Sequence, residues 1–270
     1  MLKTHGTLIS PEMLQAHLDE PVRILDCRAR LGDPAYGSRV YAEGHIPGAL
    51  QASLDDDFAA APGAAGRHPL PDRARLRDRF RDWGIDDSTQ IVVYDDAGGA
   101  FAARAWWCAR WLGHEAVAVL DGGIDAWEGP LSSARPAVAP GSFSIRPALT
   151  RTVDAATLQA ELGEVALVDA RTRARFDGLE EPIDPVAGHI PGAVCLPFQD
   201  NLGGDGRFRQ ADELARRFED LPDPVICYCG SGVTAAHNVL ALCIAGRAEP
   251  VLYPGSWSEW IVDPTRPRAP

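Results

Sequence analysis

The sequence of 270 residues lacks long apolar runs and has no excess of positive charge. No stretch approaches the roughly 20 apolar residues that a membrane-spanning helix needs, and the first residues show no hydrophobic core of a secretory signal. The formal net charge of −12 disfavours nucleic acids and anionic membranes as partners, because both are bound by clustered Lys and Arg side chains. We therefore expect a cytoplasmic protein with neither a nucleic-acid nor a membrane partner. A local pocket for a small anion is compatible with this charge.

Cysteine is also scarce, with six residues spread through the chain. Most of them lie in apolar runs, where cysteine usually behaves as a small buried hydrophobic residue and not as part of a disulfide framework. Cys227 and Cys229 form a close pair, but no second Cys or His pair stands at the spacing of a zinc site. The sequence therefore implies no metal or other cofactor.

The second half of the chain repeats four blocks of the first half in the same order. Short repeats in one order and at nearly constant spacing indicate a tandem duplication. The paired blocks are 24–28 with 167–171, 44–49 with 188–193, 91–95 with 225–229, and 121–127 with 254–260.

Each half alternates short apolar strands with helical segments, such as a strand over 90–95 followed by a helix over 101–112. This alternation predicts an α/β fold in which each half forms an open, mostly parallel sheet with helices on both faces. The stretch 129–141 is rich in Pro, Ser and Gly and has no periodicity, which is typical of a linker. We predict a first domain over 1–130, a linker over 131–150 and a second domain over 151–270.

Cys229 follows a predicted strand and precedes a Gly/Ser loop and a helix. A thiol at a helix N-terminus lies among unpaired backbone N–H groups, which favour the thiolate. Gly230 and Gly232 let the backbone curl so that N–H groups converge into a nest for negative charge. The repeat places Asp95 at the matching position of the first half, so we expect this position to face solvent or a cleft. A reactive Cys229 is favoured over a cysteine in a purely geometric turn.

A cysteine in such a loop can also belong to a phosphatase. A phosphatase loop ends in an arginine at the start of the helix, which clamps the phosphate with two hydrogen bonds. Ala235 occupies the place of that arginine here. The phosphatase interpretation therefore lacks its essential group.

The sequence resembles the two-domain rhodanese-type sulfurtransferases, and among them the 3-mercaptopyruvate sulfurtransferases, over nearly its whole length. The resemblance rests on the loop 229–234, on the two His-Ile-Pro-Gly-Ala segments and on the closing block 255–260. Thiosulfate-preferring members usually carry basic residues after the cysteine. The Cys-Gly-Ser-Gly-Val-Thr loop is similar to the mercaptopyruvate type.

The resemblance implies a double-displacement reaction. The Cys229 thiolate would attack the sulfur of a small anionic donor, carry it as a persulfide and pass it to an acceptor. The implied donor is 3-mercaptopyruvate, and the acceptor is a thiol such as thioredoxin or glutathione, or cyanide in an assay. Two alternatives stay open, namely a thiosulfate:cyanide sulfurtransferase and a non-catalytic sulfur carrier or binding module with the same fold.

The resemblance also implies roles for further residues. In the mercaptopyruvate type a serine and a first-domain aspartate assist proton movement, and these match Ser231 and Asp55. Two arginines after the first strand of the second domain bind the donor carboxylate, and these match Arg171 and Arg175. Because Arg28 holds the place of Arg171 in the first half, we also expect a structural ion pair there. The loop residues expected to contact the donor are Gly230, Gly232, Val233 and Thr234.

His45 and His189 stand in the repeated His-Ile-Pro-Gly-Ala segments of both halves. Histidine titrates near neutral pH and is therefore a frequent catalyst. Because the half without the cysteine carries the same histidine, we expect both residues to be architectural, for instance by bonding to the backbone of a turn.

Overall fold

The computed structural model describes residues 4–18 and 20–270, which form two compact units. Unit 1 contains the chain up to Ala60, Pro71–Leu149 and Asp205–Arg207, and unit 2 contains Ala61–Leu70, Thr150–Gly204 and Phe208–Pro270. Each unit thus includes a short segment from the sequence half that mainly forms the other unit. The domain boundaries at 130 and 151 stay a prediction. Among the described residues, none of the helices has the length and apolar character to cross a membrane.

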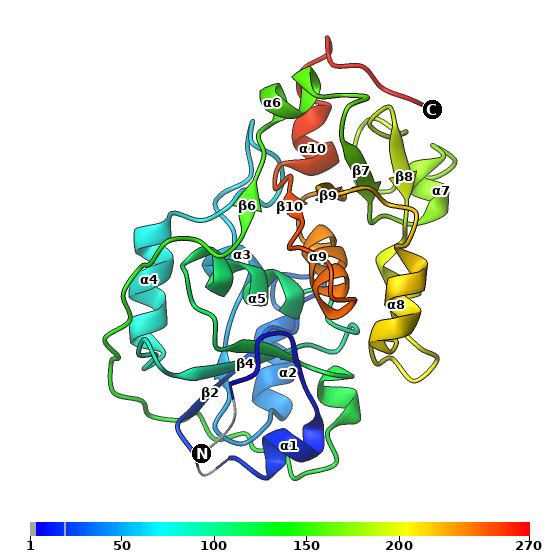
Figure 1. Ribbon diagram of the computed structural model, residues 1–270. Coiled ribbons are helices and arrows are strands. Elements are labelled where there is room, and N and C mark those ends of the chain that lie inside the picture. Colours follow the sequence, from blue (N-terminus) through cyan, green and yellow to red (C-terminus); the bar gives the residue numbers. More distant parts are fainter. Residues whose placement is uncertain (1–3, 19) are drawn as a thin grey trace. The chain divides into compact units, whose positions relative to one another are not determined.

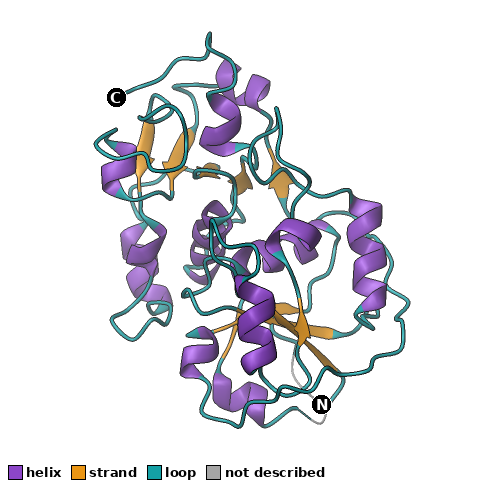
Figure 2. Cartoon of the chain, turned by 180° about the vertical axis from the view of Figure 1, so that it is seen from behind, coloured by secondary structure: helices purple, strands orange, loops and turns teal. Residues whose placement is uncertain are grey.

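Unit 1 is built on a five-stranded sheet in which every strand pair is parallel. The strand order is β1-β5-β4-β2-β3. The central strand β4 is buried along its whole length. Helices lie on either side of this sheet (Figure 2). The strands are β1 Leu8–Ile9, β2 Val22–Asp26, β3 Leu50–Gln51, β4 Gln90–Tyr94 and β5 Val117–Leu120.

Unit 2 repeats this sheet with the order β6-β10-β9-β7-β8, again with parallel pairs (Figure 1). The registers also repeat, since Asp26 pairs with Tyr94 in unit 1 and Asp169 pairs with Tyr228 in unit 2. The tandem α/β fold predicted from the sequence is confirmed. The strands are β6 Arg151–Thr152, β7 Ala166–Asp169, β8 Ala193–Cys195, β9 Val225–Tyr228 and β10 Val251–Leu252.

Three helices of unit 1 begin where a polar side chain caps them. The Ser10, Ser53 and Asp72 side chains accept backbone N–H groups of the first turns of α1, α3 and α4. Because Asp72 is the cap, α4 begins at Arg73. The helices are α1 Pro11–Gln15, α2 Tyr36–Glu43, α3 Leu54–Asp57, α4 Arg73–Asp82, α5 Ala102–Trp111 and the 3₁₀ helix η1 Gly123–Ala126.

Unit 2 has a matching set of helices, of which α9 and α10 frame the end of β9. Helix α9 is the longest and is buried from Ala235 to Leu242. The helices are α6 Ala155–Ala160, α7 Arg173–Phe176, η2 Phe198–Asn201, α8 Ala211–Arg217, α9 Thr234–Ile244 and α10 Ser256–Trp260.

The two His-Ile-Pro-Gly-Ala segments are structural. His45 Nδ1 lies 2.8 Å from the Tyr41 carbonyl oxygen, and His189 Nδ1 lies 2.8 Å from that of Phe176. Each imidazole also stacks on the aromatic ring of the same partner residue. The prediction that these histidines are architectural is confirmed.

Candidate active site

Strand β9 carries Cys229 to the carboxyl end of the sheet, which is where ligands bind in open parallel sheets. The Cys229 side chain is 2% exposed. Its Sγ accepts the backbone N–H of Gly232 at 3.1 Å and that of Ser231 at 3.5 Å. The loop predicted from the sequence therefore does curl around the sulfur atom, and its N–H groups favour negative charge on that atom.

Gly232 is required by the shape of this loop. Its φ is 76°, in the left-handed region, and a Cβ there would lie 2.3 Å from the Pro254 carbonyl oxygen. Val233 precedes the first residue of α9, and Thr234 begins the helix. The structure thus gathers the predicted residues Gly230, Gly232, Val233 and Thr234 in one loop after the thiol.

Helix α10 fixes the loop from the other side. The Trp257 N–H donates to the Cys229 carbonyl oxygen at 3.0 Å, and the Ser258 N–H donates to that of Gly230 at 2.9 Å. The Ser256 hydroxyl accepts the Cys229 N–H at 3.1 Å and donates to the Tyr253 carbonyl oxygen at 2.9 Å. Because these bonds hold both sides of the thiol-bearing residue, the nest is preorganised.

The segment 61–70 brings two residues to the loop that sequence reasoning missed. His68 Nδ1 lies 2.7 Å from the Ser231 hydroxyl oxygen. The Arg67 N–H donates to Ser258 Oγ at 3.1 Å, which fastens the segment to α10. A Gly-rich stretch followed by two basic residues was the one local signal in the sequence. It could not show that this first-half segment belongs to unit 2.

Arg175 reaches the loop, whereas Arg171 is buried and bonded to other parts of the fold. A Cβ on Gly230 would lie 2.8 Å from Arg67 Nη2 and 3.4 Å from both Nη atoms of Arg175. The Arg171 residue is 2% exposed, and its Nη2 donates to Asp169 at 2.7 Å and to the Gly188 carbonyl oxygen at 2.8 Å. The donor contacts of both Arg171 and Arg175 stay predictions.

The structural ion pair expected for Arg171 has a counterpart in unit 1. In unit 1, Arg28 Nη2 donates to Asp26 at 2.6 Å and to the Gly44 carbonyl oxygen at 2.7 Å. Both arginines thus join a strand end to the residue before a His-Ile-Pro-Gly-Ala segment. Because the half without the cysteine keeps this bond set, it serves the fold in both units.

Two carboxylates accompany the arginines of unit 2. Arg175 Nη2 lies 2.7 Å from Glu181 and 3.2 Å from Asp184, and Arg67 pairs with Asp184. Burial alone would raise the pKa of Glu181, but hydrogen bonds from Arg175 and from two backbone N–H groups lower it. Burial raises the pKa of Asp184, and Arg67 offsets this only in part. The positive charge beside the loop is therefore balanced within the protein.

The remaining cysteines differ from Cys229 in their surroundings. All six cysteines are free thiols. Burial raises the pKa of Cys27 and Cys227, and it raises the pKa of Cys108 and Cys195 to about 11. These four thiols stay protonated at neutral pH, so they are poor nucleophiles.

Asp55 lies in α3 of unit 1 and is exposed. Burial of its neighbour Asp57 raises the pKa of that carboxyl group, and the Asp57 side chain accepts the Ser53 N–H at 2.7 Å. Asp57 therefore stabilises the first turn of α3. A role for Asp55 in proton movement stays a prediction.

The expectation that Asp95 faces solvent or a cleft is wrong. Asp95 is 0% exposed. Its carboxylate accepts four backbone N–H groups at 2.8 to 2.9 Å, from Ala97, Gly99, Phe101 and Ala102. The loop of unit 1 has folded around the side chain of its own aspartate, which is why a charged residue is tolerated there.

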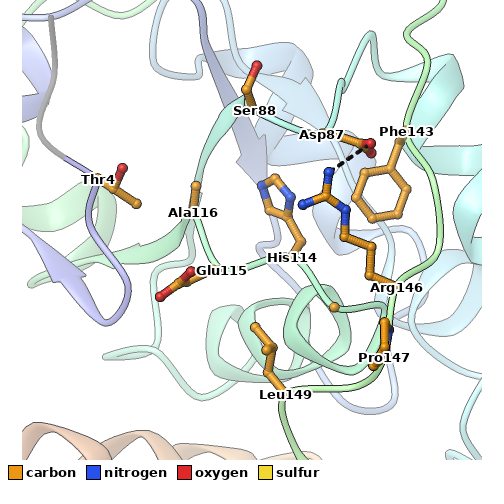
Figure 3. A pocket seen from close by; sticks show the side chains of 11 residues that line it. Thr4, Asp87, Ser88, His114, Glu115, Ala116, Phe143, Arg146, Pro147 and Leu149 are labelled. Atoms are coloured by element: carbon orange, nitrogen blue, oxygen red, sulfur yellow. Dashed lines mark hydrogen bonds and ion pairs between the residues drawn. The ribbon is translucent and has the colours of Figure 1, made fainter.

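Unit 1 also contains a hollow of about 500 Å³. Figure 3 shows Arg146 beside Asp87, and the two form an ion pair of 3.0 Å. His114 Nε2 lies 2.8 Å from the Thr89 carbonyl oxygen, and its ring meets Phe143 edge-on. These polar groups already have protein partners and the lining contains no thiol, so we place the candidate site at Cys229.

Comparisons with known proteins identify the family of the chain. The family model of the rhodanese-like domain matches residues 10–130 and 153–263. A Pseudomonas aeruginosa protein named "Probable 3-mercaptopyruvate sulfurtransferase" is 52% identical over 97% of each chain. The thiosulfate sulfurtransferase of Mus musculus is 33% identical over 94% of this chain and 89% of its own. The structure of SseA from Escherichia coli, described as a 3-mercaptopyruvate sulfotransferase, has a TM-score of 0.82 at 30% identity and covers 93% of this chain and 99% of its own.

Proposed function

The chain belongs to the family of two-domain rhodanese-type sulfurtransferases, and we propose that it transfers sulfur from 3-mercaptopyruvate through a persulfide on Cys229. The observation that carries this proposal is the position of the Cys229 sulfur inside a preorganised nest of backbone N–H groups. The loop places no basic residue directly after the cysteine, and the relative from Pseudomonas aeruginosa is named for the same donor.

The first half-reaction is attack of the Cys229 thiolate on the sulfur of the donor. A sulfur–sulfur bond forms and the carbon–sulfur bond of the donor breaks. The electron pair of the broken bond stays on carbon as the enolate of pyruvate, which then takes up a proton. The N–H groups that face Cys229, together with those of the first turn of α9, stabilise the persulfide that remains.

Ser231 and His68 are suited to deliver that proton, because the Ser231 hydroxyl oxygen lies 2.7 Å from His68 Nδ1. We assign Asp55 to the same proton movement, as a further proposal. Arg175 binds the donor carboxylate beside Gly230, and Arg171 contributes to the binding of the same carboxylate.

The second half-reaction returns the thiolate. A thiol such as glutathione or reduced thioredoxin attacks the outer sulfur, the persulfide bond breaks, and its electron pair returns to Cys229. No metal or organic cofactor enters either step. The reducing environment of the cytoplasm suits an enzyme whose six cysteines are free thiols.

Incubation with 3-mercaptopyruvate followed by mass measurement of the intact protein tests the proposal. We expect the mass to increase by one sulfur atom, and we expect Cys229→Ser to abolish the gain. Cys227→Ser is the matched control and should still take up sulfur, because Cys227 is a buried thiol with a raised pKa. Sulfur uptake that survives Cys229→Ser would refute the assignment.

Thiosulfate is the second candidate donor, because the Mus musculus relative is named a thiosulfate sulfurtransferase. Measuring kcat/KM with both donors distinguishes the two functions, and a clear preference for thiosulfate would reject our first choice. A non-catalytic binding module would turn over neither donor.

A further inference from the structure

Two guanidinium groups converge on Gly230, the residue after the nucleophile. A Cβ there would lie within 2.8 Å of Arg67 and 3.4 Å of Arg175. Arg67 Nη2 and Arg175 Nη1 donate no hydrogen bond to any residue within 4–18 and 20–270. We call these two side chains the arginine pair. Its unused donors face the backbone beside Cys229.

Asp184 bridges the arginine pair with its two carboxylate oxygens. Oδ1 pairs with Arg67 Nη1, and Oδ2 accepts from Arg175 Nη2 at 3.2 Å. The Asp184 side chain is 3% exposed. One oxygen on each guanidinium is also how an external carboxylate would bind this pair, since arginine recognises carboxylates through such paired donors.

Glu181 contacts Arg175 as well, but it is part of the local fold. Its Oε1 accepts the Ile183 and Asp184 N–H groups at 3.1 and 3.0 Å, and its Oε2 also pairs with Arg171 at 3.3 Å. The Asp184 carboxylate has partners in the arginine pair only, among the residues that the structure describes. Of the two carboxylates, Asp184 can therefore leave without loss of backbone hydrogen bonds.

We propose that the arginine pair selects the anionic group of the sulfur donor, with Arg67 as its second cation, and that Asp184 is a built-in competitor which the donor displaces. This inference rests on the proposed function. The exchange replaces one carboxylate by another, so the charge beside Cys229 does not change. Between turnovers Asp184 keeps the partly buried Arg67 from being left without an anionic partner, which would be costly, and it gives Arg175 a second partner beside Glu181.

The exchange also concerns the proton path. Arg67 is the neighbour of His68 in the segment 61–70, and its own backbone N–H is bonded to Ser258. A donor held by Arg67 is therefore held by the same short segment that places His68 at Ser231. Donors without an anionic group cannot displace Asp184 and are rejected.

Steady-state kinetics with 3-mercaptopyruvate and inhibition by pyruvate test the proposal. Asp184→Asn removes the competing charge, so we expect KM for the donor and Ki for pyruvate both to fall about tenfold. This is the change expected if the Asp184 carboxylate occupies the binding site of the arginine pair about nine-tenths of the time. Arg67→Gln should raise both values about tenfold, and Arg67→Lys should restore part of the loss. Arg173→Gln is the matched control. Arg173 lies in helix α7 with Arg175, and its side chain is 61% exposed. It contacts Asp177 at 3.6 Å and the Cys195 carbonyl oxygen at 3.4 Å, and neither contact involves the arginine pair, so no change is expected.

The outcomes separate this inference from the proposed function. If Asp184→Asn raises KM and Ki, Asp184 positions the arginines and does not compete, and the inference is wrong. If Arg67→Gln changes neither the donor KM nor the pyruvate Ki, Arg67 does not bind the donor and the inference is wrong. Calorimetric titration of Cys229→Ser with pyruvate measures the affinity of the arginine pair for a carboxylate without turnover. A higher affinity in the double variant with Asp184→Asn supports the inference even if 3-mercaptopyruvate delivers no sulfur. Absence of sulfur uptake by the unmodified protein would overturn the proposed donor alone.

Discussion

The loops that follow β4 and β9 are arranged alike, but each encloses a different side chain. At the end of β4, the Asp95 carboxylate accepts four N–H groups of the following loop and is fully buried. At the end of β9, the Cys229 sulfur accepts two N–H groups of its loop. A loop that gathers N–H groups attracts an anion. In unit 1 the N–H groups surround a fixed carboxylate, and in unit 2 they face the Cys229 sulfur, on which we propose that negative charge is held during the reaction.

The support around the two loops is shared. The Asp95 carbonyl oxygen accepts the Ile124 N–H at 3.0 Å, and the Cys229 carbonyl oxygen accepts the Trp257 N–H at 3.0 Å. In unit 1 Gly123 allows the close approach, since a Cβ there would meet the Asp95 carbonyl oxygen at 2.2 Å, whereas Ser256 holds the matching place in unit 2 with a φ of 54°. The duplication thus kept the scaffold of the loop, and the two copies differ in what the nest contains.

Replacing the enclosed side chain should separate the two loops most clearly. Asp95→Ala leaves four buried N–H groups without an acceptor, so we expect the free energy of unfolding of unit 1 to fall by about 3 to 5 kcal/mol. Cys229→Ala removes a smaller and weaker acceptor and should cost about 1 kcal/mol in unit 2. Urea unfolding followed by circular dichroism measures both.

The matched control for this pair is Asp95→Asn, whose amide oxygen keeps part of the acceptor set. Its free energy of unfolding should lie between that of Asp95→Ala and that of the unmodified protein. Equal losses in the free energy of unfolding for Asp95→Ala and Cys229→Ala would mean that Asp95 stabilises its loop no more than Cys229 does. The proposed difference between the two loops would then be wrong.

The repeated arginines give the next largest effect. Arg28→Met and Arg171→Met each leave a buried aspartate without its cationic partner, and we expect each to lower the free energy of unfolding by about 3 kcal/mol. Denaturation of each variant, together with the KM of any that stays folded, checks this. If Arg171→Met raises KM without loss of stability, Arg171 acts on the donor and the two arginines are not equivalent.

The fold was predictable because its signals are local. Strands such as Gln90–Tyr94 are short apolar runs, and the repeat of blocks supplied the tandem arrangement. The loop at Cys229 was predictable for the same reason, since a strand, glycines and a helix follow one another in the chain. These features depend on neighbours in sequence, which a single sequence displays.

Contacts between distant segments were not predictable. Arg67 and His68 lie in a stretch without a repeated counterpart, and their partners Asp184 and Ser231 stand far along the chain. The burial of Asp95 was missed because a charged residue at a strand end usually indicates exposure. Only the three-dimensional path of the loop shows that four N–H groups surround it.

Ser231→Ala tests whether the second loop performs proton transfer in addition to holding charge. We expect the rate of sulfur uptake from 3-mercaptopyruvate to fall about 100-fold, with little change in stability, if Ser231 and His68 form the proton path that we propose. Rapid quench followed by intact mass measures the rate. His68→Gln should have a similar effect, and the double variant should lose little more than either single one. Additive losses would show that the two side chains act separately.

Gly230→Ala distinguishes the space over the second loop from its backbone. The added methyl group would meet the mobile ends of Arg67 and Arg175 and no backbone atom within 3.4 Å. We expect stability to change by less than about 0.5 kcal/mol and the donor KM to rise about tenfold as the arginines are pushed aside. Gly204→Ala, where a Cβ meets nothing within 4 Å, is the control and should leave KM unchanged. A large loss of stability in Gly230→Ala would show that the loop itself is too tight for a methyl group.

Acid should reveal a smaller difference that belongs to unit 1. Burial lowers the pKa of His114, so the native state binds fewer protons than the unfolded chain once the pH falls below the unfolded value of about 6.5. Protons then favour unfolding, and the stability of unit 1 should fall as the pH decreases, by at most about 1.4 kcal/mol for each pH unit. Urea unfolding of the unmodified protein and of His114→Gln at a series of pH values measures this slope. The variant should lose the part of the slope below pH 6.5 that the histidine causes, and an unchanged slope would assign the acid sensitivity to other groups. The aspartate nest and this histidine both lie in unit 1, so the unit that lacks Cys229 would show the larger dependence of its stability on these two groups.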